Sequence, residues 1–475
     1  MYLKYIATIA FAILLSLSLS GQENRTFDGS GNNVAIPTMG QAGSNLTRIM
    51  SNGYSDGISS PGGQNRPNPR VLSNSIFAQN SNTNDGMGLS DFLWTFGQFI
   101  DHDITAISEN PAEPAMIAID FDDPHFNPGG SIPNVMIPMF RNMPAPGTGT
   151  DASNPRSHVN QISHWLDGSN IYGSSQAQAD WMRSFVDGKM KTSAGNLLPW
   201  NTTTGEKADP IDPNAPHMDD AVGAASRLFV AGDARANEQP LLTACHTVFV
   251  REHNRMCNIL VNEHPDWTDE EIFQEARRWN VAMYQAIVFE EWLPAMGVHL
   301  PEYTGYDESV DGSISNVFSA AAFRLGHTLL NGNIQRLDSD GNVIPDGNLT
   351  LAEAFFNPDV VENVGLAPYF QGMAQQVEQA LDSKIIDDVR NFLFGPPGAG
   401  GLDLASININ RGRERGLPDL NTIRTDLGLA AFSDFSEIST DAATTSALEA
   451  AYNDINDIDP WVGICLLYTS PSPRD

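Results

Sequence analysis

One segment, SDFLWTFGQFIDHDI, constrains the fold of this chain more than any other. It places Gln98, Asp101 and His102 at positions i, i+3 and i+4, which lie on one face of an α-helix. Ser90 or Asp91 can cap the start of this helix, and the aromatic and aliphatic residues between supply its apolar faces. A lone buried histidine is usually a hydrogen-bonded structural residue. Acids and a glutamine beside that histidine would be costly in an ordinary core, so we expect a polar site along this helix.

Composition limits the class of protein and its partners. The chain has 475 residues, and 41% of them are hydrophobic, which indicates a folded protein with a sizeable core. The formal net charge of −32 disfavours nucleic acid and anionic membrane surfaces as partners. We therefore expect no nucleic acid partner, and solubility is sufficient reason for the acidity.

The first 21 residues have the pattern of a secretory signal peptide. Lys4 precedes an apolar run over 5–19, and small residues follow as far as Gly21. The apolar run is too short to span a bilayer, and no later segment is long and apolar enough to do so. We expect a signal peptide at 1–21, a secreted, extracellular protein and no membrane span.

The remaining chain changes character along its length. Residues 22–85 are rich in Gly, Asn, Ser and Pro, which predicts an extended N-terminal arm that lies over a domain. Helical periodicity dominates later, and we find no internal repeat. The predicted helices span 90–104, 175–185, 240–263, 269–292, 314–330, 351–356 and 369–383. The expected fold class is mostly α, with long loops and little β, in a single large domain over 86–463.

Two smaller patterns have structural interpretations. The DSDG sequence that begins at Asp338 resembles half of an EF-hand loop, but no downstream Glu completes it, so a hairpin turn is expected. Cys245 and Cys257 fall on one predicted helix, roughly 18 Å apart along its axis. They cannot form a disulfide with each other, and the third cysteine is Cys465.

Several side chains offer hard oxygen atoms of the kind that Ca²⁺ prefers. Ser163, Asp167 and Ser169 lie close together in NQISHWLDGSNIYG, with the carbonyl of Trp165 between them. Asp103 follows His102 but points off its helix face, and it can add a carboxylate. Ca²⁺ takes six to eight oxygen ligands. The alternative is a plain capped turn.

Three further segments carry residues with chemical potential. AGDARANE places Arg235 and Glu238 at i and i+3, which is also the pattern of an ion pair at a helix start. REHNR, in the following helix, is best interpreted as a structural, salt-bridged face. FRLGHT places His327 on an apolar helix, where it could ligate haem iron.

Taken in order, GQFIDHD, NQISHWLDGSNIYG, AGDARANE, REHNR, FRLGHT and ININRGRERGLP resemble the animal-type haem peroxidase superfamily. This is the group of peroxidasin, myeloperoxidase and lactoperoxidase, including secreted bacterial members. The match runs from about residue 25 to Gly463, in the family's order and approximate spacing. The resemblance implies a single haem peroxidase domain, haem b, calcium, and hydrogen peroxide as oxidant.

The resemblance also implies roles for individual residues on the peroxide-binding side of the haem. His102 resembles the distal histidine, the base that takes a proton from peroxide and returns it to the leaving oxygen. Arg235 resembles the distal arginine, whose charge stabilises the breaking O–O bond. Gln98 resembles the distal glutamine, which helps to hold water and a halide. Asp101 and Glu238 match the carboxylates that form ester bonds to haem in mammalian members.

On the other side of the haem, His327 resembles the proximal iron ligand. Asn408 resembles the asparagine that accepts the second ring N–H of that histidine. Arg324 and Arg411 would pair with haem propionates. Asp103, Ser163, Trp165, Asp167 and Ser169 match the family's calcium site, with Ser163 where many members have Thr.

Two departures from the family pattern bear on function. Gln239 stands where myeloperoxidase has the methionine that makes a third link to haem, which favours bromide, iodide and thiocyanate over chloride. After DIDPWVG the family continues with more helices, whereas this chain ends in CLLYTSPSPRD. We expect residues 464–475 to be a non-native tail and the domain to be truncated at its C-terminus.

The expected function is that of a secreted haem peroxidase that oxidises halides, pseudohalides or small aromatic donors. One alternative is a haem fatty-acid dioxygenase of the cyclooxygenase branch, but the residues around Leu325 offer no radical-forming tyrosine. A second is an inactive, calcium-stabilised extracellular matrix or adhesion protein. The joint presence of His102, Arg235 and His327 argues against the second alternative.

Overall fold

The computed structural model describes residues 24–223, 226–397 and 401–467. The predicted signal peptide and residues 468–475 of the predicted tail lie outside this part of the chain. The α-helices are α2 (Pro69–Leu72), α3 (Phe92–Ile104), α4 (Ser169–Tyr172), α5 (Gln176–Met182), α6 (Pro240–Glu263), α7 (Asp269–Ala286), α8 (Leu293–Ala295), α9 (Asn316–Ala320), α10 (Leu351–Ala354), α11 (Asp359–Val364), α12 (Ala367–Gln375), α13 (Asp387–Arg390), α14 (Leu404–Glu414), α15 (Leu420–Asp426), α16 (Ala442–Ala451) and α17 (Pro460–Leu467).

Shorter 3₁₀ and π segments join these helices, and the strands are few. The 3₁₀ segments are η2 (Ala194–Asn196), η4 (Ala322–Thr328), η5 (Phe435–Glu437) and η6 (Ile455–Asp457), and the π segments are η1 (Ser73–Phe77) and η3 (Ile287–Trp292). The strands are β1 (Glu109–Pro114), β2 (Ile117–Ala118), β3 (Met136–Ile137), β4 (Phe140–Asn142), β5 (Asn333–Ile334) and β6 (Leu349–Thr350). They pair antiparallel as β1–β4, β2–β3 and β5–β6, with Ile117 opposite Ile137 and Ile334 opposite Leu349. The predicted mostly α class is confirmed.

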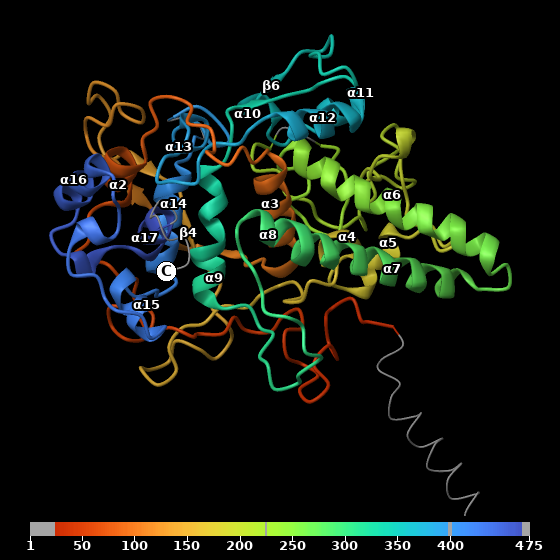
Figure 1. Ribbon diagram of the computed structural model, residues 1–475, viewed down its shortest axis with the longest axis horizontal. Helices are drawn as coiled ribbons and strands as arrows, with labels where there is room; N and C mark the ends of the chain where they lie inside the picture. Colours follow the sequence, from red (N-terminus) through yellow and green to blue (C-terminus); the bar gives the residue numbers. More distant parts are fainter. Residues whose placement is uncertain (1–23, 224–225, 398–400, 468–475) are drawn as a thin grey trace, which may run out of the picture.

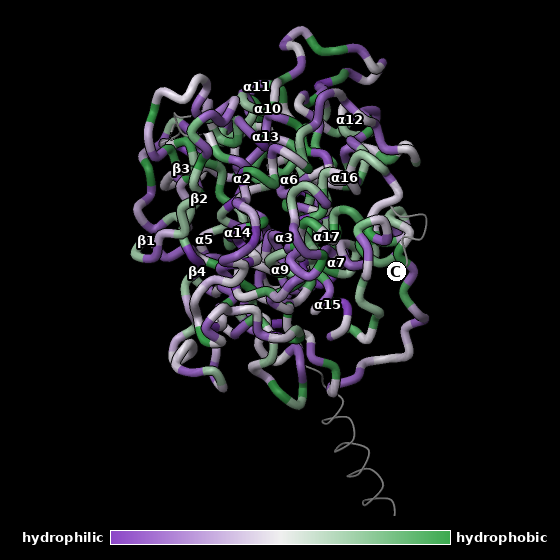
Figure 2. The backbone as a smooth tube through the Cα atoms, turned by 90° about the vertical axis from the view of Figure 1, so that its left-hand side faces the viewer, coloured by the Kyte–Doolittle hydropathy of each residue, from purple (hydrophilic) through white to green (hydrophobic). Residues whose placement is uncertain are grey.

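The helix α3 packs against α6, and α6 lies beside α7 (Figure 1). Phe99 of α3 stacks on Phe249 of α6 with ring centroids 5.0 Å apart, and both rings are buried. Such aromatic contacts add to the burial of apolar area that holds the helices together. The labels of the same helices lie near the middle of the view in Figure 2, with long loops around them. The core therefore fixes α3, which carries the polar residues identified in the sequence.

The chain before α3 is tied to the domain by backbone contacts, and Leu72, Ile76 and Phe77 of α2 and η1 are buried in the core. Asn45 forms an isolated antiparallel bridge with Val159, and Thr47 forms a parallel one with Ser315. Gly29 has φ +76°, and a Cβ atom there would lie 2.4 Å from Ser163 Oγ. Only glycine fits that position without strain, so this part of the chain closely covers the loop that contains Ser163.

Several predicted helix boundaries were wrong. The predicted helix over 314–330 is divided into α9 and η4, because Ala321 leaves the helical region with φ −139° and ψ −61°. The prediction for 369–383 extends too far, since α12 ends at Gln375 and Val377 pairs with Ser90. The predicted helix over 269–292 is α-helical to Ala286 and then becomes π-helical.

Other differences are small. The predicted helices at 175–185 and 351–356 are shorter, as α5 and α10. Asp91 stands at the N-cap position of α3, but its side chain makes no capping hydrogen bond. It accepts hydrogen bonds from Trp94 Nε1 at 2.9 Å and from Asn331 Nδ2 at 2.8 Å, which compete for its oxygens.

Three other predictions are confirmed. The helix over 240–263 has the predicted bounds as α6. Asp338 begins a turn that joins Leu337 to Val343 in an antiparallel bridge, as expected for a hairpin. The three cysteines are buried and unpaired. Among the described residues no helix is both long and apolar enough to cross a membrane.

Candidate active site

A cavity of about 420 Å³ lies at the junction of α3, the segment before α6, η4 and α14. Eight of the residues predicted to act in catalysis or to hold the cofactor line it: Gln98, Asp101, His102, Arg235, Glu238, Arg324, His327 and Arg411. Apolar side chains, among them Trp292 and Phe323, form much of the remaining wall. Charged groups in a largely apolar cavity are the usual mark of a binding or catalytic site.

The imidazole of His102 is almost fully buried, with 3% of the residue exposed. Burial, and then the nearby positive charge of Arg235, lower its pKa well below the ordinary value for histidine. The ring is therefore neutral at physiological pH and has one nitrogen free to accept a proton. Its Nδ1 lies 3.5 Å from Oδ1 of Asp233, which leaves Nε2 for the cavity.

The guanidinium of Arg235 is held by several oxygen atoms. Nε and Nη2 donate to Oδ1 and Oδ2 of Asp233, both at 2.8 Å. Nη2 also donates to the carbonyl oxygen of Thr105 at 2.9 Å, and Nη1 to Oδ2 of Asp101 at 3.3 Å. Arg235 is therefore a fixed positive charge beside His102 rather than the simple helix-start partner of Glu238 that its spacing also allowed.

Two carboxyl groups in the cavity are not fully ionised at neutral pH. Burial raises the pKa of Glu238 to about 7 and that of Asp101 to about 6, although Arg235 opposes both shifts. Gln239 accepts a hydrogen bond from Leu241 N at 2.7 Å and donates one to Gln98 Oε1 at 3.2 Å. It therefore ties the start of α6 to the glutamine on α3.

His327 contacts Asn408, as the sequence predicted, but the amide is turned the other way. Nδ2 of Asn408 lies 2.7 Å from His327 Nδ1, and its Oδ1 accepts from Nη1 of Arg324 at 3.1 Å. Because a guanidinium can only donate, it takes the amide oxygen and directs the amide nitrogen to the ring. Burial and then Arg324 lower the pKa of His327 to about 3, so the ring is neutral. With Nδ1 accepting from the Asn408 amide, the ring proton is on Nε2, and metal binding through Nε2 requires this amide to turn.

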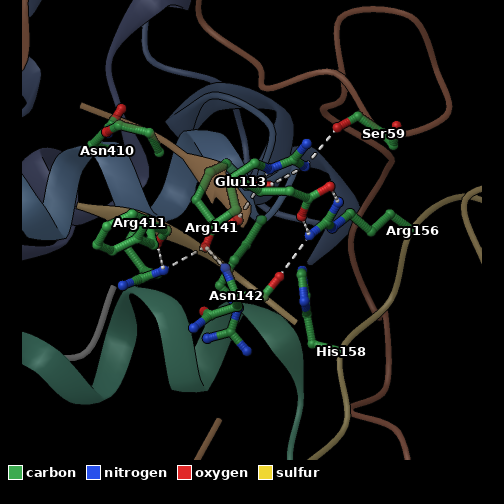
Figure 3. A network of polar contacts seen from close by, with 12 residues as sticks. Ser59, Glu113, Arg141, Asn142, Arg156, His158, Asn410 and Arg411 are labelled. Atoms are coloured by element: carbon green, nitrogen blue, oxygen red, sulfur yellow. Dashed lines mark hydrogen bonds and ion pairs between the residues drawn. The ribbon is translucent and has the colours of Figure 1, made fainter. Parts of the chain in front are cut away.

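Arg411 lies at the edge of a polar network between α14 and the β1–β4 pair (Figure 3). It donates to the carbonyl oxygen of Phe140 at 3.0 Å and to Glu414 Oε1 at 2.8 Å, and it also pairs with Glu109. Arg156 extends the network by donating to Asn142 O at 2.6 Å. These bonds fix Arg411 in the cavity wall, while Arg324 keeps fewer partners.

The segment with the predicted calcium ligands packs against the end of α3. Ser169 Oγ donates to Asp103 Oδ1 at 2.8 Å, and Ser163 Oγ donates to Asp167 Oδ2 at 2.7 Å. Oδ1 of Asp167 is buried without a hydrogen-bond partner among the described residues. Burial and then the charge of Asp103 raise the pKa of Asp167 to about 8. The Trp165 carbonyl accepts from Asp167 N at 2.8 Å.

These oxygens have the chemistry of a site for a hard cation. Within the described part of the chain, no group of three or more His, Cys, Asp or Glu is placed to hold a metal. A cation here would therefore depend on the carboxylates of Asp103 and Asp167 together with hydroxyl and carbonyl oxygens, which is a donor set suited to Ca²⁺. The buried, unpartnered oxygen of Asp167 is the observation that fits such an ion.

REHNR has a structural role, as expected. Arg255 pairs with Glu252 on the surface at 2.7 Å, and His253 is buried between Tyr172 and Gly188 O, each at 2.9 Å. Sequence reasoning missed Asp233 and the contact between Gln239 and Gln98. The spacing in AGDARANE draws attention to its last acid, Glu238, and gives no role to its first, so only the fold shows that Asp233 faces His102.

The residues around the cavity fit haem. His327 offers a neutral imidazole for iron, Arg324 and Arg411 offer cations for propionates, and Asp101 and Glu238 offer carboxyls in an apolar wall. Bound haem would supply a redox-active iron that breaks the O–O bond of peroxide and holds its two oxidising equivalents.

Comparisons with known proteins agree with this arrangement. A family model described as animal haem peroxidase matches residues 24–472. Peroxinectin A of Dictyostelium discoideum is 33% identical over 96% of this chain and 85% of its own length. The structure of peroxidase A from Dictyostelium discoideum superposes with a TM-score of 0.85 at 32% identity, covering 93% of this chain and 86% of that one.

More distant matches are informative for the fold. Thyroid peroxidase of Sus scrofa is 32% identical over 92% of this chain, which spans about half (52%) of that relative. A fatty acid alpha-dioxygenase of Oryza sativa shares the fold, with a TM-score of 0.72 at 19% identity over 93% of this chain and 74% of that one. The family model and the peroxidase relatives together place the chain in the animal haem peroxidase family, as a haem-dependent oxidoreductase that acts on peroxide.

Proposed function

We propose that this peroxidase is secreted and uses hydrogen peroxide to oxidise bromide, iodide, thiocyanate or small aromatic donors. The observation that carries the proposal is the combination of buried His102 and half-buried Arg235, which line one cavity with His327. With bromide the reaction balances as H₂O₂ + Br⁻ + H⁺ → HOBr + H₂O. An aromatic donor would instead give up one electron and one proton in each of two steps.

His102 acts as the general base and then as the general acid. Its neutral ring takes a proton from one oxygen of the peroxide and returns it to the other, which leaves as water. A base must be unprotonated at working pH, and the lowered pKa of His102 satisfies this requirement. Arg235 keeps its positive charge and stabilises the negative charge that develops on the leaving oxygen.

Gln98 holds the small reductant or a water beside these two residues. Its carbonyl oxygen accepts from Gln239, and its amide also hydrogen-bonds to the carboxyl group of Glu238, which fixes the amide beside the cavity. Gln239 has no sulfur to link to haem, where myeloperoxidase has a methionine. We therefore favour bromide, iodide and thiocyanate over chloride, which is the hardest of these anions to oxidise.

Haem b would be held by five further side chains in the proposal. His327 would ligate the iron, and Asn408 lies against its Nδ1. Arg324 and Arg411 pair with the propionates. Arg324 would be the residue that exchanges Asn408 for a propionate, and the amide oxygen of Asn408 could then accept the Nδ1–H of His327. Asp101 and Glu238 are the carboxyls placed for ester bonds to haem.

Calcium would bind between α3 and the loop that follows residue 162. Asp103 and Asp167 supply carboxylates, Ser163 and Ser169 supply hydroxyls, and Trp165 supplies its carbonyl. The cation would relieve the repulsion between the two buried carboxylates. Because Asp103 is adjacent to His102, the same ion would hold the base in place.

The test combines a spectrum with turnover. The haem-loaded chain is mixed with hydrogen peroxide, and then with bromide or thiocyanate, beside His102→Ala and His327→Ala. We expect a Soret band that shifts with peroxide and halide oxidation that is lost in His102→Ala. His327→Ala should show a changed haem spectrum before any peroxide is added. Haem bound normally but inert to peroxide in the unchanged chain would refute the proposed function.

A further inference from the structure

We propose that Asp233 is the positioning residue of this site: its carboxylate orients His102 through Nδ1 and joins it to Arg235 as one unit. The inference rests on the proposed function, in which His102 is the base. The sequence pattern does not single out Asp233, whereas the distances around its buried carboxylate do.

Both carboxylate oxygens of Asp233 accept hydrogen bonds from Arg235. Oδ1 accepts from the backbone N of Arg235 at 2.9 Å and from its Nε at 2.8 Å, and Oδ2 accepts from Nη2 at 2.8 Å. Only 3% of Asp233 is exposed. Burial alone would raise the pKa of this carboxyl, but the charge of Arg235 holds the pKa far below the usual range. Asp233 is therefore an ionised, immobile anion.

The same oxygen faces the distal histidine. Oδ1 of Asp233 lies 3.5 Å from His102 Nδ1, and no hydrogen-bond partner for that nitrogen lies within reach among the described residues. An anion at this distance favours the tautomer with the proton on Nδ1. That tautomer leaves Nε2 unprotonated, which is the form that a base for peroxide requires.

The surrounding residues offer His102 Nδ1 no competing anion. His246 lies in the same buried cluster, and its Nδ1 is occupied by the carbonyl oxygen of Asn170 at 3.0 Å. Burial lowers the pKa of His246 to about 4, so this second ring is neutral. Asp101 is directed to Arg235 at 3.3 Å. Asp233 is thus the group that can set the tautomer of His102.

The test compares two haem ligands: one must lose a proton in order to bind, and the other binds without proton transfer. Cyanide arrives as HCN and must lose its proton to bind ferric haem as an anion, whereas carbon monoxide binds ferrous haem without proton transfer. In Asp233→Asn the amide oxygen has to stay at the Oδ1 position, because the backbone N–H and Nε–H of Arg235 both donate there. The variant therefore loses the negative charge that favours a proton on His102 Nδ1. We expect HCN association and the peroxide reaction to slow by about 10²-fold or more, with carbon monoxide association unchanged.

Two controls separate positioning from general damage. Asp123→Asn removes an equally buried carboxylate, 3% exposed, that also pairs with an arginine through two bonds, at 2.8 and 3.2 Å to Arg70, outside the cavity. This variant should bind HCN normally. In a His102→Ala background, Asp233→Asn should slow HCN association no further, because residues that act as one unit are not additive.

The outcomes are distinct. Asp233→Asn with normal HCN association, or with carbon monoxide slowed to the same degree, would overturn the inference. A further loss in the His102→Ala background would also overturn it. If Asp233→Asn does not fold, Asp233→Glu keeps the charge but displaces it from Nδ1, and it should slow HCN association selectively. If the unchanged chain does not react with peroxide, the proposed function is refuted. The comparison of HCN association between the unchanged chain and Asp233→Asn still tests the role of Asp233.

Discussion

Replacing Arg235 with lysine tests whether the geometry of the cation, and not its charge alone, serves the peroxide reaction. The guanidinium donates to four oxygens: two of Asp233 at 2.8 Å, one of Thr105 at 2.9 Å and one of Asp101 at 3.3 Å. A lysine ammonium carries the same charge on a single nitrogen and cannot reproduce the paired bonds to Asp233. Arg235→Lys therefore keeps the positive charge and loses the paired hydrogen bonds to Asp233.

The structure gives two separate magnitudes for this change. At least one charge-assisted hydrogen bond is lost, so the free energy of unfolding should fall by about 1.5–3 kcal/mol. Loss of a correctly placed donor at a developing negative charge costs about 10²–10³ in rate, or about 2.7–4 kcal/mol. We expect the rate of the peroxide-dependent Soret shift to fall by that factor, measured by stopped flow on samples matched for haem content.

Arg70→Lys is the matched control. Arg70 is buried and makes a similar set of bonds, to Asp123 at 2.8 Å, Asp403 at 2.7 Å and Asn391 at 2.7 Å, but it does not line the cavity. It should lower the free energy of unfolding by a similar amount and leave the peroxide rate unchanged. An Arg235→Lys variant with an unchanged peroxide rate, or an Arg70→Lys variant slowed equally, would refute the reasoning.

Much of the helical framework could be predicted because its signals are local. The helix α6 begins at Pro240 after the capping side chain of Gln239, and its predicted bounds are confirmed. The break at Ala321 has no such local signal. It places Arg324 Nε against the carbonyl oxygen of Ser319 at 3.0 Å, a contact that periodicity cannot predict.

The residues that line the cavity could be identified from their ordered motifs, but their partners could not. Asp233 and His102 are far apart in the sequence, and the loop that ends at α6 brings them together. The orientation of the Asn408 amide likewise depends on Arg324, which approaches from a different element. Spacing within one segment identifies faces of a helix, whereas contacts between loops depend on the whole fold.

The helix α3 connects the cavity physically to the predicted cation-binding loop. Asp101 and His102 face the cavity, and Asp103, the next residue, turns to the opposite side and accepts from Ser169. A helix rotates by about 100° per residue, so adjacent positions must serve different neighbours. Any force on Asp103 from the loop therefore acts on the backbone that carries His102.

The remaining predictions concern the cation, the haem linkage and pH. Chelation with EGTA should lower the melting temperature of the haem-loaded chain. Asp167→Asn should remove that response, because the buried oxygen that fits the cation is gone. An unchanged melting temperature after chelation would contradict the calcium site. After peroxide turnover, acidified acetone should leave haem on the protein, and the double variant Asp101→Asn/Glu238→Gln should release it, since amides cannot form the esters. Glu378 is 1% exposed and carries an oxygen without a partner among the described residues; burial, then Asp85 and Asp91, raise its pKa to about 9. Between pH 5 and 7 the unfolded chain has lost this proton and the folded chain keeps it, so stability should fall as pH rises, by at most about 1.4 kcal/mol per pH unit. Glu378→Gln has no proton to lose and should flatten the decline in denaturant-unfolding free energy over that range; an equally steep decline in the variant would show that Glu378 is not its source.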